Sequence, residues 1–307
     1  MNTSPQRDQD QYAMRFVDPQ VLARIDNLDL LARRVVDGFI SGLHHTVHLG
    51  VSTDFAEHRA YTAGDDVRRL DWRVYARTDR LYVKTFEAQT NADVVSVIDI
   101  SRSMDFASAS VSKLDYAKFL AASLTHLGAR QRDRVALATF DDDLRDWIPP
   151  SARHRNTILR SLERVSASAV GEIELPMERL ASLLNRRSIV VLISDCYTAP
   201  ERLGNSLGLL AAAGHDLIVM QILDPLELDF EMHGEDVLED LESGERLSVD
   251  PDAIRAQYLQ LIRGHTRALE TICSERRVDY ACFNTALPLD HALSRYLSQR
   301  ARLARRR

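Results

Sequence analysis

Three oxygen-bearing side chains stand at alternate positions directly after an apolar run in the stretch "VVSVIDISRSMD". They are Asp99, Ser101 and Ser103. Carboxylate and hydroxyl oxygens are the ligands that a hard divalent cation such as Mg²⁺ prefers. Because hydroxyls are neutral, a cation held mainly by Ser101 and Ser103 keeps positive charge for an incoming carboxylate. A second apolar run ends in a similar way, at Ser194 and Asp195.

The elements that must position these residues alternate along the chain from residue 93 onward. The runs "VVSVID", "IVVLIS" and "LIVMQIL" are apolar throughout, which is typical of parallel strands covered by helices on both faces. We therefore predict an α/β fold with a doubly wound, mainly parallel sheet. The predicted strands are 93–99, 134–140, 188–194, 216–222 and 278–283, and the predicted helices are near 112–130, 153–165, 176–185, 200–213, 252–275 and 289–303. In such a sheet ligands bind beyond the carboxyl ends of the strands, so Asp99 and Asp195 are expected to converge there.

The domain organisation follows from changes in composition. Residues 1–18 are polar and are predicted to be disordered. Residues 19–91 form an N-terminal segment, with helical spacing over 19–43 and short β-like runs at 46–51 and 81–86. The α/β domain occupies 92–307 and contains an insertion at about 224–252, where twelve Asp and Glu accompany a single Arg246. The stretch "DVLEDLESGERLSVD" within it predicts a hairpin that turns at Ser243 and Gly244.

Two motifs resemble a known family. The stretch "DISRSM" resembles the metal-ion-dependent adhesion site of von Willebrand factor A domains, which are Rossmann-type folds, and Asp195 in "LISDCY" matches the later aspartate of that site. The upstream stretch "EHRAYTAGDDVRRLDWRVYARTDRLYVKTFEAQ" resembles the signature of the domain-of-unknown-function 58 family, and the similarity spans about residues 28–297. The resemblance implies a protein without enzymatic motifs that binds a protein partner, with a MoxR-type AAA+ ATPase as the implied partner.

The resemblance also implies a metal site with one departure from the family pattern. Its ligands are Asp99, Ser101, Ser103 and Asp195, and its cofactor is Mg²⁺. The adhesion site usually includes a threonine from an intermediate loop, but the matching stretch "SAVGEIELPMERL" has none. Glu172 and Glu174 are therefore two further candidate ligands, and the alternative is a site that has lost its metal.

Composition limits the function classes. The net charge of −6 argues against a general nucleic-acid binder, and between residues 65 and 80 four aspartates nearly balance five arginines. No apolar run approaches the ~20 residues of a membrane-spanning helix, so we expect no stable membrane insertion. The N-terminus lacks the apolar core of a secretory signal, and three irregularly spaced cysteines fit a reducing compartment, so a cytoplasmic location is expected.

Several alternatives remain open from the sequence alone. Asp99, Ser101 and Ser103 are also residue types that cap helices. His44, His45, His48 and His58 are more typical of surface or strand positions than of a zinc site, because no cysteine lies nearby. The expected function is a non-enzymatic adaptor that engages a protein through the adhesion-like site. The competing hypotheses are a metal-free interaction scaffold and a metal-dependent phosphoester hydrolase.

Overall fold

The structure is a computed structural model that describes residues 19–22, 27–45, 57–60, 72–85, 92–168, 171–232, 236–239, 246–290, 292–296 and 298. Contacts divide the chain into two units, with residues 46–91 in one and the remaining residues in the other. The predicted N-terminal segment was 19–91. In the structure, residues 28–45 belong to the same unit as the sheet. The predicted disorder of residues 1–18 lies outside the described residues.

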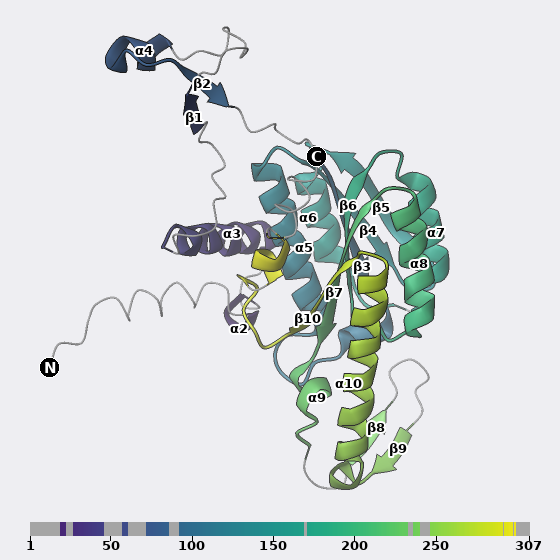
Figure 1. Cartoon of the computed structure of the whole chain (residues 1–307). Coiled ribbons are helices and arrows are strands. Elements are labelled where there is room, and N and C mark those ends of the chain that lie inside the picture. Colours follow the sequence, from purple (N-terminus) through teal and green to yellow (C-terminus); the bar gives the residue numbers. More distant parts are fainter. Residues whose placement is uncertain are drawn as a thin grey trace, which may run out of the picture. The chain divides into compact units, whose positions relative to one another are not determined.

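The larger unit is built on a six-stranded sheet with the order β10-β7-β6-β3-β4-β5 (Figure 1). All neighbouring pairs are parallel except β4 and β5, which are antiparallel. The strands are β3 (Asp93–Asp99), β4 (Arg134–Phe140), β5 (Leu144–Ser151), β6 (Ser188–Ser194), β7 (Asp216–Leu223) and β10 (Asp279–Asn284). From β3 the chain adds β4 and β5 on one side, and then adds β6, β7 and β10 on the other side of β3. This order makes the sheet doubly wound. This confirms the predicted fold class.

Helices cover both faces of this sheet, as Figure 1 shows. Every residue of β3 and β6 is buried, because alternate side chains point into two separate apolar cores. One core includes side chains from α3 (Leu28–His45), α5 (Lys113–Arg130), α6 (Arg155–Arg164) and the helical residues 292–296. The other includes side chains from α7 (Glu174–Leu183), α8 (Pro200–Ala212) and α10 (Pro251–Glu275). The predicted strands, and the predicted helices up to residue 275, therefore exist, with ends that differ by a few residues. Of the predicted helix 289–303, the structure describes helical residues 290, 292–296 and 298, and the rest lies outside the described residues.

The strand β5 was not predicted. Its sequence "LRDWIPPS" contains two prolines, which cannot donate backbone hydrogen bonds and so argue against a central strand. They are tolerated here because β5 lies at the edge of the sheet and pairs only with β4. An edge position removes the requirement for a second hydrogen-bonding partner.

The helix α5 is buried on nearly all sides. Its inner face packs on the sheet, and its outer face is covered by α3 through Leu31, Val35 and Val36. An ion pair between Arg130 Nη1 and Asp37 Oδ1 at 2.6 Å joins the two helices. The chain thus uses α3 as an additional outer layer on one face of the sheet.

The remaining elements are short. The smaller unit contains β1 (Glu57–Ala60) paired antiparallel with β2 (Tyr82–Thr85), and α4 (Trp72–Thr78). The run predicted at 46–51 lies outside the described residues. In the larger unit, α2 (Pro19–Leu22) precedes α3, α9 (Pro225–Asp229) follows β7, and β8 (Asp236–Glu239) pairs antiparallel with β9 (Arg246–Val249). That pairing confirms the predicted hairpin, although its turn at 243–244 lies outside the described residues.

Within the parts of the chain that the structure describes, none of the helices combines the length and the apolar character that crossing a bilayer requires.

Candidate functional site

The structure brings the ends of β3 and β6 together at the point where the sheet reverses its winding. The two strands are parallel neighbours, so their carboxyl ends lie at the same edge of the sheet. Ser194 Oγ donates a hydrogen bond to Asp99 Oδ2 at 2.6 Å, and Ser101 N donates to Asp99 Oδ1 at 2.8 Å. Asp99 is only 6% exposed. This edge is where open α/β sheets bind ligands.

The hydroxyls of Ser101 and Ser103 lie 3.1 Å apart, close to Asp99 in the chain. Ser101 precedes the short 3-10 helix η2 (Arg102–Asp105), but its side chain makes no capping hydrogen bond there. The helix α5 is capped instead by Ser112, which accepts a hydrogen bond from Asp115 N. Ser101 is thus the N-cap residue of η2 by position, but its side chain caps neither helix. Ser101 is buried and Ser103 is half-buried, so the hydroxyl pair leads from the interior toward solvent.

Asp195 is engaged by a lysine that the sequence analysis did not single out. Lys113 Nζ donates to Asp195 Oδ2 at 2.8 Å and to Glu227 Oε1 at 2.6 Å. The lysine side chain is fully buried, and its ammonium lies 4.7 Å from the ring centroid of Tyr197. The two carboxylates raise the pKa of Lys113 although burial alone would lower it, so this lysine is charged.

The charged side chains beside the hydroxyl pair have a net negative charge that one divalent cation would balance. Asp99, Asp195 and Glu227 supply three negative charges when ionised, and Lys113 supplies one positive charge, so these four side chains carry a net charge of −2. Burial and, next, the charge of Asp195 raise the pKa of Asp99 to about 6. The hydrogen bonds that Asp99 accepts come from the neutral groups Ser101 and Ser194. An oxygen-rich site with this charge fits Mg²⁺, with Ser101 and Ser103 as holding groups and Asp99 beside them.

A third loop approaches the same site through Gly171, which has no side chain that could serve as a ligand. Gly171 lies against Ser101, and a Cβ on it would be 2.7 Å from Ser101 Cβ. Ser168 anchors this loop, because its N donates to Ile100 O at 2.9 Å and its hydroxyl donates to Asp141. Hydrogen bonds from Ser168 and Arg145 outweigh the effect of burial and lower the pKa of Asp141 to about 2. Backbone of the loop thus stands close to the place where the family pattern has a threonine.

The two candidate glutamates make contacts with residues other than Asp99, Ser101 and Ser103. Glu172 is exposed, and its backbone N donates a hydrogen bond to Asp141 O at 3.0 Å. Glu174 lies in the first turn of α7 and forms an ion pair with Arg202 of α8. A role for either glutamate as a metal ligand therefore stays a prediction.

The loop after β6 holds Asp195 rigidly. Cys196 adopts a left-handed backbone conformation with φ of 57°, which is uncommon for a residue other than glycine. Three contacts support this loop: Ser194 Oγ with Cys196 N at 2.8 Å, His265 Nε2 with Cys196 O at 2.9 Å, and Gln221 Nε2 with Asp195 O at 2.9 Å. These contacts hold the backbone at Asp195 and Cys196 in place.

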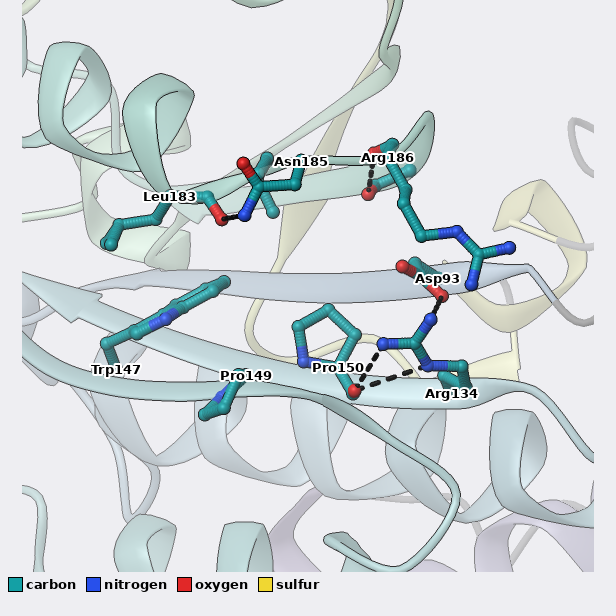
Figure 2. Close-up of a pocket in the computed structure, with 10 residues that line it drawn as sticks. Asp93, Arg134, Trp147, Pro149, Pro150, Leu183, Asn185 and Arg186 are labelled. Carbon is teal, nitrogen blue, oxygen red and sulfur yellow. Dashed lines mark hydrogen bonds and ion pairs between the residues drawn. The ribbon is translucent and has the colours of Figure 1, made fainter.

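A pocket of about 160 Å³ lies at the opposite edge of the sheet, near the amino ends of the strands. Figure 2 shows Trp147, Pro149 and Pro150 of β5 facing the segment that connects α7 to β6. Arg134 pairs with Asp93 at 3.3 Å and donates to Pro150 O at 2.8 Å. The buried polar groups here pair with one another, so the pocket belongs to the packing of the edge strand.

The histidine cluster gains no support as a zinc site. His44 and His45 end α3, His58 lies in β1 of the other unit, and His48 lies outside the described residues. Among the residues that the structure describes, no three His, Cys, Asp or Glu side chains are grouped so as to hold a metal. An adhesion-like site differs from that kind of group because hydroxyls supply much of its ligand set.

Sequence reasoning missed four residues of this edge: Lys113, Glu227, Asp141 and Gly171. A lysine in the first turn of a helix normally indicates a solvated surface, and lysines are almost never fully buried unless paired. Asp141 carried a readable signal, because it directly follows the predicted strand 134–140. Asp224 likewise follows β7 and is buried, so four neighbouring parallel strands each end at a buried aspartate.

Several solved structures are similar to this chain. They include BatB from Bacteroides thetaiotaomicron, with 17% identity, a TM-score of 0.49, and coverage of 69% of this chain and 99% of that one. An aerotolerance-related membrane protein from Bacteroides fragilis has 16% identity, a TM-score of 0.49, and coverage of 66% and 96%. The SpRpn10 VWA domain has 10% identity, a TM-score of 0.41, and coverage of 66% and 93%.

The sequence relatives are closer. Uncharacterized proteins from Mycobacterium tuberculosis and Mycobacterium bovis are each 30% identical over 255 residues, which cover 81% of this chain and 80% of theirs. The model of the family described as "Protein of unknown function DUF58" matches residues 57–268, which include the upstream signature and the whole strand-end site. The chain therefore belongs to the DUF58 family.

Proposed function

We propose that this chain is a non-enzymatic adaptor of the cytoplasm that engages a protein partner through the edge formed by Asp99, Ser101, Ser103 and Asp195. The observation that carries the proposal is a pair of adjacent hydroxyls beside a group of charged side chains whose net charge is −2. That group is Asp99, Asp195, Glu227 and Lys113. Ser101 and Ser103 would hold Mg²⁺, with Asp99 and Asp195 close by. When bound, the cation supplies positive charge that attracts a carboxylate of the partner.

Exposed apolar side chains beside the site support a protein as the ligand. Tyr197 is 45% exposed, and its ring centroid lies 6.5 Å from that of His265 on α10. Leu261 is one helical turn before His265 on the same face of α10 and is 65% exposed. A partner that places a carboxylate at the hydroxyl pair could cover this surface, which we call the Tyr197–Leu261 surface.

The proposal of a binding function rather than catalysis rests on how the acids are held. Asp99 accepts hydrogen bonds from Ser101 and Ser194, and Asp195 is ion-paired with Lys113. A general base must come within hydrogen-bond distance of the substrate proton, whereas Asp99 and Asp195 are only 6% and 1% exposed. Turnover in a phosphoester panel above a metal-free control would favour the hydrolase hypothesis instead.

The partner we propose is a MoxR-type AAA+ ATPase, which the family resemblance implies. The test is capture of the purified ATPase from the same organism by the full chain in Mg²⁺ and in EDTA. We expect capture in Mg²⁺ to be lost in EDTA and in an Asp99→Ala/Ser101→Ala variant, whereas a Ser123→Ala variant keeps it, because Ser123 bonds only within α5. Capture by the double variant at the wild-type level would rule out the site as the contact.

Metal binding is tested separately by melting the protein at increasing Mg²⁺. A ligand that binds only the folded state stabilises it by about 2.7 kcal/mol at a hundredfold excess over its Kd. A melting temperature that does not change at millimolar Mg²⁺ would favour the metal-free scaffold, for which the Lys113–Asp195 ion pair is the supporting observation.

A further inference from the structure

Lys113 binds Asp195, which would otherwise be the second carboxylate available to a metal at this site. Its side chain has no exposed surface, and its ammonium lies 2.8 Å from Asp195 Oδ2. The other oxygen, Asp195 Oδ1, accepts a hydrogen bond from Tyr197 N at 3.4 Å. Both oxygens of Asp195 are therefore already in contact with donors of this chain.

The ammonium is held there by groups that are themselves fixed. Glu227 Oε1 accepts from Lys113, and Glu227 Oε2 accepts from Asp224 N at 2.8 Å as part of the capping box of α9. Phe106 and Tyr197 lie over the ammonium, with ring centroids at 5.8 and 4.7 Å. Such aromatic faces attract a cation. Lys113 is thus unlike a surface lysine that swings freely in solvent.

We propose that Lys113 is a built-in competitor for the cation, a positioning residue that occupies Asp195 and thereby weakens the hold of the site on a divalent metal. This inference rests on the proposed function and adds how the site is regulated. With Asp195 occupied, Ser101, Ser103 and Asp99 remain to hold the cation. A cation held by two neutral hydroxyls and one carboxylate keeps more of its positive charge for the partner.

If the cation binds weakly in the absence of the partner, the binding of the metal and the binding of the partner depend on each other. By thermodynamic linkage, a partner carboxylate that raises the affinity for the cation has its own affinity raised by the same factor. The site would then be filled mainly when both are present. Removal of Lys113 should reverse this balance and give a tighter metal site that depends less on the partner.

A pair of substitutions separates competition from net charge. Lys113→Met alone leaves Asp195 and Glu227 without a counter-charge, so this variant is expected to melt at a lower temperature. The double variant Lys113→Met/Glu227→Gln removes one charge of each sign and keeps the net charge at −2. Glu227→Gln alone keeps Lys113 on Asp195 and reduces the negative charge by one, and it opens no cavity.

The experiment is calorimetric titration of the full-length wild type and these variants with Mg²⁺, with circular dichroism to confirm folding. We expect the double variant to bind Mg²⁺ at least about tenfold more tightly than wild type, which corresponds to about 1.4 kcal/mol. Glu227→Gln should bind more weakly than wild type. A purely structural role for Lys113 would only weaken binding, so a gain of affinity identifies competition.

The outcomes distinguish this inference from the proposed function. Measurable binding by wild type with no gain in the double variant overturns the role of Lys113 and leaves the metal site standing. Binding by the double variant alone supports competition and means that the ammonium has replaced the metal in the wild type. Absence of binding in both folded proteins overturns the competitor role together with the metal site. Should the double variant not fold, affinity of Glu227→Gln equal to or above wild type counts against the inference.

Discussion

Gly171 lies so close to Ser101 that a Cβ on the glycine would be 2.7 Å from Ser101 Cβ and 3.2 Å from Ser101 Oγ. A separation below 3.0 Å requires one of the two groups to move. We therefore expect Gly171→Ala to displace Ser101 and to reduce the stabilisation by Mg²⁺ measured in thermal melts. The same clash explains why the chain does not carry a larger residue at this point of the third loop.

The matched control for that prediction is Gly264→Ala. Gly264 lies inside α10, and a Cβ there would meet nothing within 4 Å. This substitution should stabilise the helix by up to about 1 kcal/mol without changing the response to Mg²⁺. If Gly171→Ala keeps the full response, the hydroxyl of Ser101 is not a ligand.

Asp99 should make the metal-free protein less stable as the pH rises. Its pKa is about 6 in the folded protein against 3.8 for an ordinary aspartate, because burial and Asp195 disfavour the charge. The folded state binds more protons between these two values, so the free energy of unfolding falls by about 3 kcal/mol as the pH rises through this window. Asp99→Asn should remove this dependence, and in EDTA above pH 6 it should be more stable than wild type.

Urea unfolding in EDTA at pH 4, 5, 6 and 7 tests this prediction. The introduced asparagine can still accept from Ser101 N, and the hydroxyl of Ser194 can turn to accept from its amide. In Mg²⁺ the order should change, since the amide side chain lacks the negative charge that favours the cation. A wild-type protein whose stability stays constant or increases between pH 4 and 6, relative to Asp99→Asn, would contradict the assigned environment of Asp99.

Asp141 should behave in the opposite way. Its pKa of about 2 lies below the usual 3.8 because Ser168 and Arg145 bind its ionised form, so its contribution to stability is present above pH 3.8 and is lost as the pH falls toward 2. Removing a hydrogen bond to a charged group costs about 1.5–3 kcal/mol. Ser168→Ala should therefore destabilise the protein by that amount at pH 7 and by a smaller amount at pH 2.5, where the loss of this stabilisation is already under way, measured by urea unfolding.

Ser123→Ala is the control for this pH dependence. Ser123 is buried, and its hydroxyl donates to the carbonyl of Phe119, which does not titrate. Its cost should be the same at both pH values. Equal pH profiles for the two variants would show that Ser168 acts only through packing.

The Tyr197–Leu261 surface is expected to contribute to partner capture without affecting the metal. Leu261→Ser should change the free energy of unfolding by no more than about 0.5 kcal/mol, because the side chain is largely exposed. It should weaken capture of the ATPase in Mg²⁺ at least severalfold while leaving the Mg²⁺ titration unchanged. Leu209→Ser is the control, since Leu209 is 43% exposed on α8. Equal capture by both variants would place the partner elsewhere.

The apolar strands could be predicted from the sequence because burial on both faces leaves a continuous hydrophobic run. The runs 93–99 and 188–194 are strands with those same ends in the structure. The edge strand β5 was not predicted because its prolines at 149 and 150 argue against a strand in the middle of a sheet. The sequence does not show that this segment lies at the edge, where prolines are tolerated. The convergence of Asp99 with Ser194 followed from the rule that parallel strands share one carboxyl edge.

The partners of the site could not be predicted in the same way. Lys113 is distant in sequence from both Asp195 and Glu227, and its burial depends on how α5 packs at the edge of the sheet. The hydrophobic periodicity predicts a helix near 112–130, but it does not predict whether Lys113 at its start points into the protein or into solvent. The placement of Glu174 was equally a matter of packing, because its pairing with Arg202 joins two helices.

The position of α3 has a practical consequence for work on recombinant fragments. The family match begins at residue 57 and the sheet at residue 93, so either position looks like a natural starting point for expression. A protein begun at either place would lack Leu31, Val35 and Val36 and would present the outer face of α5 to water. Such fragments should aggregate or bind hydrophobic dyes, whereas one that begins before Leu28 should remain monodisperse.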